Sequence, residues 1–153
     1  MYTCFDIAKQ FLDFADRESS MIDPMKLLKL VYISHGWHLG TEGKPLINNE
    51  IKAWKYGPVI PELYFVIKRF GAGAVDKELL DLYSEVNTDE KTTEFLKVIW
   101  DTHKHLSALE LSAYTHQEGS PWSKTYNPSA DSAIIPNYII QNYYHQLTVP
   151  VGN

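Results

Sequence analysis

The chain has 153 residues and a formal net charge of −5, with 22% charged and 44% apolar residues, a composition typical of a soluble globular protein. A chain of this length is expected to form one domain that buries roughly 70% of the surface of its unfolded state, so the fold needs no metal or disulfide. The single cysteine, Cys4, excludes an internal disulfide, and no apolar run reaches the roughly 18 residues of a membrane-spanning helix. Because no secretory signal is visible at the N-terminus, the sequence predicts a cytoplasmic protein.

The first 70 residues are dominated by helix signals. Thr3 followed by Asp6 is close to a capping box and predicts a helix over residues 4–17. Asp23 before Pro24 is a strong N-terminal signal for a second helix, which is apolar on nearly all sides and is therefore predicted to be buried up to about residue 40. A third helix is expected from about residue 61 to 70, with its end at Gly71.

Between the second and third helices, glycine, proline and asparagine interrupt the helical pattern. Two short strands, residues 46–47 and 51–54, are predicted to form a hairpin joined at Asn48-Asn49, because asparagine accepts left-handed backbone angles. A sharp turn is predicted at Gly57-Pro58. The hairpin is the only β structure that the sequence favours.

The second half of the chain is also predicted to be mainly helical. A short helix is expected around residues 76–83, and Asn87 or Thr88 is expected to cap an amphipathic helix that reaches His103. Ser107 and Glu110 form a full capping box that opens another helix. Residues 119–136 are expected to be turns and irregular chain with one helical turn after Ser120-Pro121, and a last helix is expected over residues 137–147. The predicted fold is a mainly α, compact helical bundle of about six helices in a single domain over residues 1–147. A small β-hairpin around residues 46–56 is included, and residues 148–153 are expected to be a loose tail.

The charge is unevenly distributed along the chain. Residues 24–71 carry seven basic and three acidic groups, whereas the segments on both sides are acidic. The basic residues either solvate helix and turn faces or attract an acidic partner. A nucleic-acid-binding regulator is favoured only by this segment and is opposed by the net charge of the whole chain, so nucleic acid is not the expected partner.

No pattern in the sequence indicates catalysis. His35 and His38 could share one helix face, but no carboxylate or thiol stands at an interval that would complete a zinc site, so core or cleft roles are expected for both. Cys4 has no histidine nearby in sequence, and no nucleophile elbow, phosphate-binding loop or dinucleotide motif occurs. The sequence therefore predicts a protein that is not an enzyme and has no cofactor or metal.

Aromatic and proline residues crowd one short stretch, residues 53–64, whose members are Trp54, Tyr56, Pro58, Pro61 and Tyr64. Proline turns hold neighbouring rings with little entropy left to lose on binding, so such a cluster suits an interface. A second group spans residues 114–122 and includes Trp122. Two interpretations stay open, since Trp54 and Trp122 can close the ends of a helical core or support a binding surface.

Four blocks of the sequence carry a family resemblance. They are KLLKLVYISHGWHL (residues 26–39), GKPL (residues 43–46), IKAWKYGPVIPELY (residues 51–64) and LSALELSAYTHQEGSPW (residues 106–122). In this order and spacing they resemble the Panacea domain family, also described as the SocA-like antitoxin or GepA-like phage-associated family. The resemblance extends from the first helix to about Trp122, and the stretch from Ser123 onward matches nothing in it.

The resemblance implies a largely helical, non-catalytic antitoxin that binds and neutralises a cognate toxin protein, usually encoded by the adjacent gene. An alternative that it also implies is a proteolytic adaptor that delivers the toxin to a ClpXP-type protease. No catalytic residues come with the family. The candidate partner-binding residues are Trp37, His38, Trp54, Tyr56, Gly57, Pro58, Leu63, Tyr64, His116 and Trp122.

Overall fold

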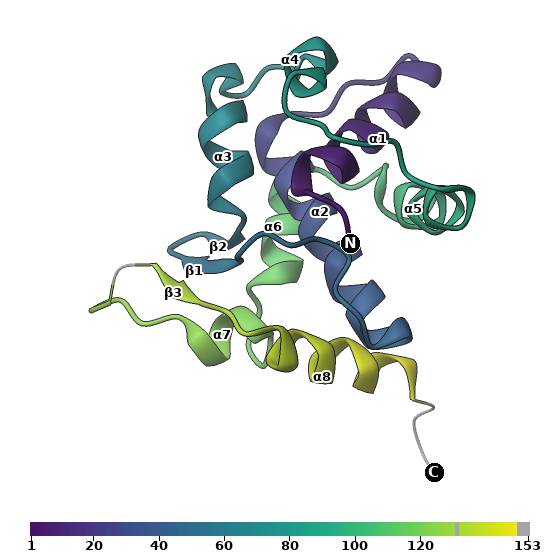
Figure 1. Cartoon of the computed structure of the whole chain (residues 1–153). Helices are drawn as coiled ribbons and strands as arrows, with labels where there is room; N and C mark the ends of the chain where they lie inside the picture. Colours follow the sequence, from purple (N-terminus) through teal and green to yellow (C-terminus); the bar gives the residue numbers. More distant parts are fainter. Residues whose placement is uncertain (131, 150–153) are drawn as a thin grey trace.

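The computed structural model describes residues 1–130 and 132–149 (Figure 1). Within these residues the chain forms eight α-helices, one 3-10 helix and three short strands, so the fold is mainly α, as predicted. The elements in chain order are α1 (Cys4–Arg17), α2 (Pro24–Glu42), β1 (Lys52–Trp54), β2 (Gly57–Val59), α3 (Pro61–Ile67), η1 (Lys68–Phe70), α4 (Lys77–Asp81), α5 (Glu90–His103), α6 (Ala108–Thr115), α7 (Pro121–Thr125), β3 (Ala133–Ile134) and α8 (Asn137–Thr148).

Helix α2 lies at the centre of the fold, and α1, α5, α6 and α8 pack around it (Figure 1). It begins as predicted, because the side chain of Asp23 accepts a hydrogen bond from the backbone N–H of Lys26 at 2.8 Å and Pro24 occupies the first turn. It ends two residues later than predicted, at Glu42, where Gly43 adopts a left-handed conformation. Neither α2 nor any other helix in residues 1–130 and 132–149 is long and apolar enough to cross a membrane.

Helix α1 begins with the predicted capping box of Thr3 and Asp6. Asp6 is buried and also accepts hydrogen bonds from the backbone N–H groups of Glu85 and Val86 and from the hydroxyl of Ser84. Although burial raises it, the sum of these hydrogen bonds and those within the capping box holds the pKa of Asp6 below its ordinary value. A single carboxylate thus begins α1 and attaches the segment that follows α4.

The small β-hairpin is present but lies further along the chain than predicted. Strands β1 and β2 pair antiparallel with Trp54 opposite Gly57, so the turn is at residues 55–56 and Gly57-Pro58 belongs to a strand. Leu46 and Ile47 do not pair with β1, because Tyr2 donates a backbone hydrogen bond to Leu46 and bridges to Ile47 in parallel register. Strand β3, which the sequence did not predict, pairs with the other edge of β1.

The boundaries of the later helices differ from the predictions by a few residues. Helix α5 begins after Asp89, whose side chain accepts from the backbone N–H of Thr92, so neither Asn87 nor Thr88 is the cap. The capping box of α6 is confirmed. The short helix expected around residues 76–83 is present as α4, and the helical turn expected after Ser120-Pro121 is the five-residue helix α7. Of the predicted loose tail, residues 150–153 lie outside the described part of the chain.

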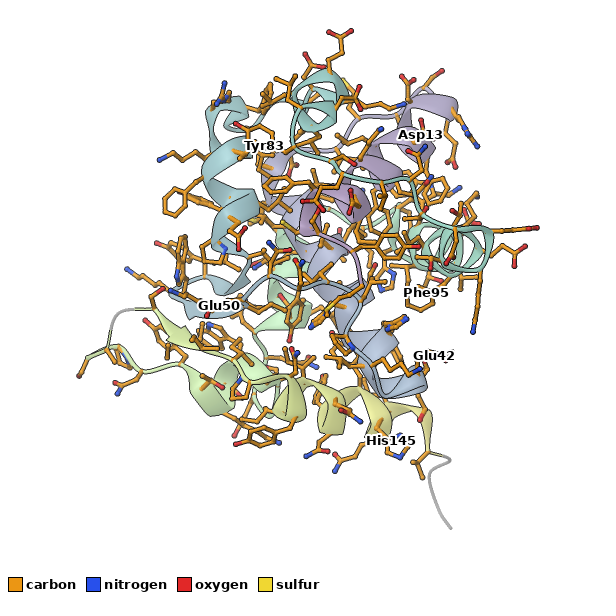
Figure 2. All side chains as sticks on the ribbon, viewed as in Figure 1. Asp13, Glu42, Glu50, Tyr83, Phe95 and His145 are labelled. Atoms are coloured by element: carbon orange, nitrogen blue, oxygen red, sulfur yellow. The ribbon has the colours of Figure 1, made fainter. Side chains whose placement is uncertain are left out.

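Helix α8 packs closely along α2 because two glycines of α2 face it. The ring of Tyr144 is fully buried over Gly36, and a Cβ added at Gly40 would lie 2.7 Å from the backbone carbonyl carbon of Tyr144. Trp37 packs edge-on against the same tyrosine, with ring centroids 5.1 Å apart. Figure 2 shows Glu42 and His145 at the corner where α2 and α8 both end.

Candidate partner-binding site

A groove of about 390 Å³ lies where the first turns of α2, the β1–β2 hairpin and α3 meet. We call it the hairpin groove; the lining residues that define it here are Leu28, Lys29, Trp54, Lys55, Tyr56, Gly57, Tyr64 and Lys68. It therefore contains the aromatic members of the cluster that the sequence singled out. It also contains Leu28 and Lys29 of α2, which lie far from the hairpin in sequence.

The aromatic side chains form one wall and the rim of the hairpin groove. Trp54 and Tyr64 are half-buried and pack edge-on, with ring centroids 5.1 Å apart, and the exposed Phe65 extends this cluster. Tyr56 is 69% exposed at the tip of the hairpin. Because none of the three groove aromatics is fully buried, the segment does more than plug the core, and its rings are accessible to a partner.

Residues of the second aromatic group, together with Ser112 of α6, hold the hairpin in place by hydrogen bonds to its backbone. The indole N–H of Trp122 donates to the backbone carbonyl of Trp54 at 2.6 Å, and the hydroxyl of Ser112 donates to the carbonyl of Tyr56 at 3.1 Å. His116 packs edge-on against Trp122, with ring centroids 5.4 Å apart. In this arrangement Trp122 and His116 act as the support of the groove.

Lys29 is the least expected member of the site. It is the only charged residue among the described buried residues of α2, and its side chain is 4% exposed. Its ammonium donates to the backbone carbonyl of Pro58 at 2.9 Å and lies beside Gly57, whose φ is 116°. Burial lowers the pKa of Lys29 to about 8.

The described charged residues that line the hairpin groove are all basic. Lys29, Lys55 and Lys68 line it, and no aspartate or glutamate among residues 1–130 and 132–149 does. The ion pairs in the described residues instead join lysines and Arg17 to carboxylates of α1, α4 and α5 and to Glu18. The groove therefore carries positive charge that residues 1–130 and 132–149 do not neutralise through ion pairs.

The structure brings some of the predicted site residues together and separates others. Trp54, Tyr56, Gly57 and Tyr64 line the groove, whereas Pro58 touches it through its carbonyl contact with Lys29, and Leu63 is fully buried in the core. Trp37 lies elsewhere on α2, beside Tyr144, and His38 packs against Phe95 of α5. The role of these ten residues in partner binding stays a prediction.

Sequence reasoning did not single out Lys29 or Leu28 as site residues. One signal was available for Lys29, since it is a charged residue inside the otherwise apolar run LLKLVYI. A lysine at such a position is either at the surface of the bundle or costs free energy by being buried. Only the fold shows that it is buried, because Pro58, whose carbonyl accepts a hydrogen bond from it, is 29 residues away in sequence.

His35 and Cys4, which we considered for chemistry, are both fully buried in the core. The Nδ1 atom of His35 accepts from the backbone N–H groups of Leu46 and Ile47, and Nε2 lies 2.9 Å from Oδ1 of Asn137. Burial lowers the pKa of His35 to about 4, and it raises the pKa of the Cys4 thiol. No cluster of three or more metal-binding side chains occurs in the part of the chain that the structure describes.

These features define a mainly helical protein with a basic, aromatic surface groove. The chain belongs to the family described as "Antitoxin SocA-like, Panacea domain", whose model matches residues 27–123. The resemblance read from the four sequence blocks is thus confirmed.

A curated relative, the protein named Antitoxin SocA from Caulobacter vibrioides (strain NA1000 / CB15N), is 33% identical to this chain over 128 residues. The alignment covers 76% of this chain and 66% of the relative, so the chain spans about two thirds of the length of the relative it matches. No solved structure matches the chain significantly.

Proposed function

We propose that this protein is an antitoxin that binds a cognate toxin protein and neutralises it without catalysis. The observation that carries the proposal is membership of the SocA-like Panacea family together with an accessible, basic, aromatic groove in the family's matched region. The relative's name states that it is an antitoxin. The proposal extends that role to this chain and places it at the hairpin groove.

The proposed mechanism is occlusion. A segment of the toxin lies in the hairpin groove between Tyr56 and Tyr64, where aromatic rings offer large contact area at low entropic cost. The lysines of the groove attract an acidic surface and so favour encounter. Because Trp122 and Ser112 hold the hairpin by hydrogen bonds to its carbonyls, the groove is largely formed before the toxin arrives.

The proposal is tested by co-expression with the product of the adjacent gene. We expect that product to stop growth when it is expressed alone, and growth to return when this protein is present. The two proteins should also copurify as a complex. An adjacent gene whose product is harmless alone, or that forms no complex with this protein, would contradict the proposed function.

Tyr56 and Tyr138 allow a matched test of where the toxin binds. Both tyrosines are exposed, 69% and 66% respectively, but Tyr56 lines the hairpin groove and Tyr138 lies on α8. Tyr56→Ala is expected to weaken binding of the toxin about tenfold, because truncating an aromatic anchor at an interface costs 1 kcal/mol or more. Tyr138→Ala should leave the affinity unchanged. Isothermal titration calorimetry of the two variants measures the difference, and equal affinities would move the interface away from the groove.

A second candidate function is that of a proteolytic adaptor, which must hold a toxin and a protease at the same time. The observation that favours it is a second groove of about 490 Å³ between α2, α5 and α6, which shares no lining residue with the hairpin groove. It is lined by Trp37, Phe95 and Val98, among others, and Val98 is 64% exposed. Exposed apolar surface of this kind suits contact with a second protein.

The adaptor function predicts that this protein shortens the lifetime of the toxin. Val98→Glu, which places a charge in the second groove, should leave toxin binding intact and lengthen the half-life of the toxin in cells with an active ClpXP-type protease. Pulse-chase measurement with and without the protease checks this expectation. A half-life that does not respond to this protein would eliminate the adaptor function while leaving neutralisation by occlusion in place.

A further inference from the structure

Among the described residues, the ammonium of Lys29 has fewer hydrogen-bond acceptors around it than it has donors. An ammonium group has three N–H donors, and in residues 1–130 and 132–149 the structure gives that of Lys29 one acceptor, the carbonyl of Pro58. No aspartate or glutamate of the described chain pairs with it. A buried cation of this kind is costly unless a charged partner is supplied.

The absence of a side chain at Gly57 lets the ammonium of Lys29 approach the backbone closely. A Cβ at this position would lie 2.9 Å from Nζ of Lys29, and the φ of 116° disfavours any residue with a side chain. Glycine therefore serves two needs here, the hairpin geometry and the close approach of the lysine. The amine lies at the junction of the hairpin with α2, within the lining of the groove.

The surroundings of the amine restrict the chemistry of a partner. Leu28 and the rings of Trp54 and Tyr64 supply apolar surface next to Lys29, and the exposed lysines 55 and 68 complete the positive lining. A carboxylate between apolar residues matches both properties. A free chain terminus matches less well, because capture of a terminal carboxylate typically uses a ring of backbone N–H groups, whereas this groove offers lysine amines.

We propose that the hairpin groove recognises an aspartate or glutamate side chain, flanked by apolar residues, in a segment of the bound toxin, and that Lys29 is the residue that pairs with it. This inference rests on the proposed function for the identity of the partner, and it adds the chemistry that the groove selects. Tyr64 and Trp54 hold the flanking apolar residues. Lys55 and Lys68, at exposed positions, contribute to attraction more than to selection.

The test uses the full chain, labelled with ¹⁵N, and synthetic peptides, so it does not depend on finding the toxin. The first peptide is acetylated and amidated and has an aspartate between two leucines. The second has asparagine in place of the aspartate, and the third has asparagine and a free C-terminal carboxylate. Shifts of the Gly57 amide and of the Trp54 indole N–H report binding in the groove and give the dissociation constants.

We expect the aspartate peptide to bind about tenfold more tightly than the asparagine peptide, which corresponds to one added charge pair in a partly desolvated site. Lys29→Met should abolish this preference. Lys91→Met, which removes a lysine from an exposed position on α5 away from the groove, should preserve it. Equal binding of the aspartate and asparagine peptides, absence of shifts at the groove, or preference for the free C-terminus would each overturn the inference.

The outcome separates the inference from the proposed function. If the toxin is neutralised but the wild-type protein shows no preference for the aspartate peptide, the inference fails and the antitoxin function stands. If the aspartate preference is present and depends on Lys29, but no adjacent gene product is bound, the groove chemistry stands and the antitoxin function fails.

Discussion

Replacing Gly40 by alanine is expected to lower the free energy of unfolding by about 3 kcal/mol, the upper part of the usual range for overpacking a core. A Cβ at this position would lie 2.7 Å from both the carbonyl carbon and the Cβ of Tyr144 and 2.8 Å from the backbone N of His145. Two of these three atoms belong to the backbone, so α8 must move as a unit. The gain in helix propensity from glycine to alanine, about 1 kcal/mol, offsets only part of this cost.

Thr41→Ala is the matched control, because Thr41 is the next residue of α2 and is exposed. Its substitution should change the free energy of unfolding by less than about 0.5 kcal/mol. Urea unfolding followed by circular dichroism gives both values. If Gly40→Ala is as stable as the wild type, α8 is not held against α2 by close backbone packing, and the placement of Tyr144 over Gly36 is also in doubt.

Helix starts could be predicted from the sequence because their signals are local. The side chains of Thr3, Asp23 and Ser107 each accept a hydrogen bond from the backbone N–H three residues further on, and all three residues cap helices in the structure. The apolar character of α2 likewise predicted a buried helix, because burial on all sides requires apolar residues on all sides.

Strand pairing could not be predicted in the same way, because partners are chosen over long distances. Leu46 and Ile47 looked like a strand beside the asparagine pair, but their backbone partner is Tyr2. Asn49 then accepts from the backbone N–H of Cys4 at 2.7 Å, so it serves the start of α1 instead of a hairpin turn. Similarly, β3 arrives from beyond residue 130 to pair with β1.

Only part of the candidate site could be predicted, because its residues come from both neighbouring and distant parts of the sequence. Trp54, Tyr56 and Tyr64 are close in sequence, so composition alone identified them as a cluster. Lys29 joins them only because the hairpin folds back over the first turns of α2, which places Pro58 within hydrogen-bond distance of its ammonium. A charge that no local pattern explains was therefore the clue to the most informative residue of the groove.

Replacing Lys29 by methionine is expected to raise the free energy of unfolding by about 2 kcal/mol at pH 7. Burial lowers the pKa of Lys29 from 10.5 to about 8, so the charged form is less favourable in the folded than in the unfolded protein by about 3 kcal/mol. Methionine fills a similar volume without the charge, and the hydrogen bond lost at Pro58 returns about 1 kcal/mol of that gain. Lys91→Met, at an exposed position, should change stability by less than about 0.5 kcal/mol.

The lowered pKa of Lys29 predicts how the stability of the wild-type protein changes with pH. Between pH 8 and 10.5 the unfolded state binds more protons at this lysine than the folded state does, so the wild-type protein gains stability as pH rises through this window. Lys29→Met lacks the group and should lack that gain. The difference in stability between variant and wild type should therefore shrink from pH 7 towards pH 10, as measured by urea midpoints. A difference that stays constant with pH would contradict the lowered pKa.

The two effects of Lys29→Met together decide why a buried lysine is present. If a residue serves only the fold, its replacement destabilises the protein. Binding is then lost only to the extent that folded protein is lost. We expect instead a variant that is more stable and yet binds the toxin less tightly, because the ammonium is held at a cost that a carboxylate of the partner offsets. A less stable variant with unchanged affinity would make Lys29 a structural residue that fastens the hairpin through Pro58, and the groove would then bind its partner through the aromatic rings alone.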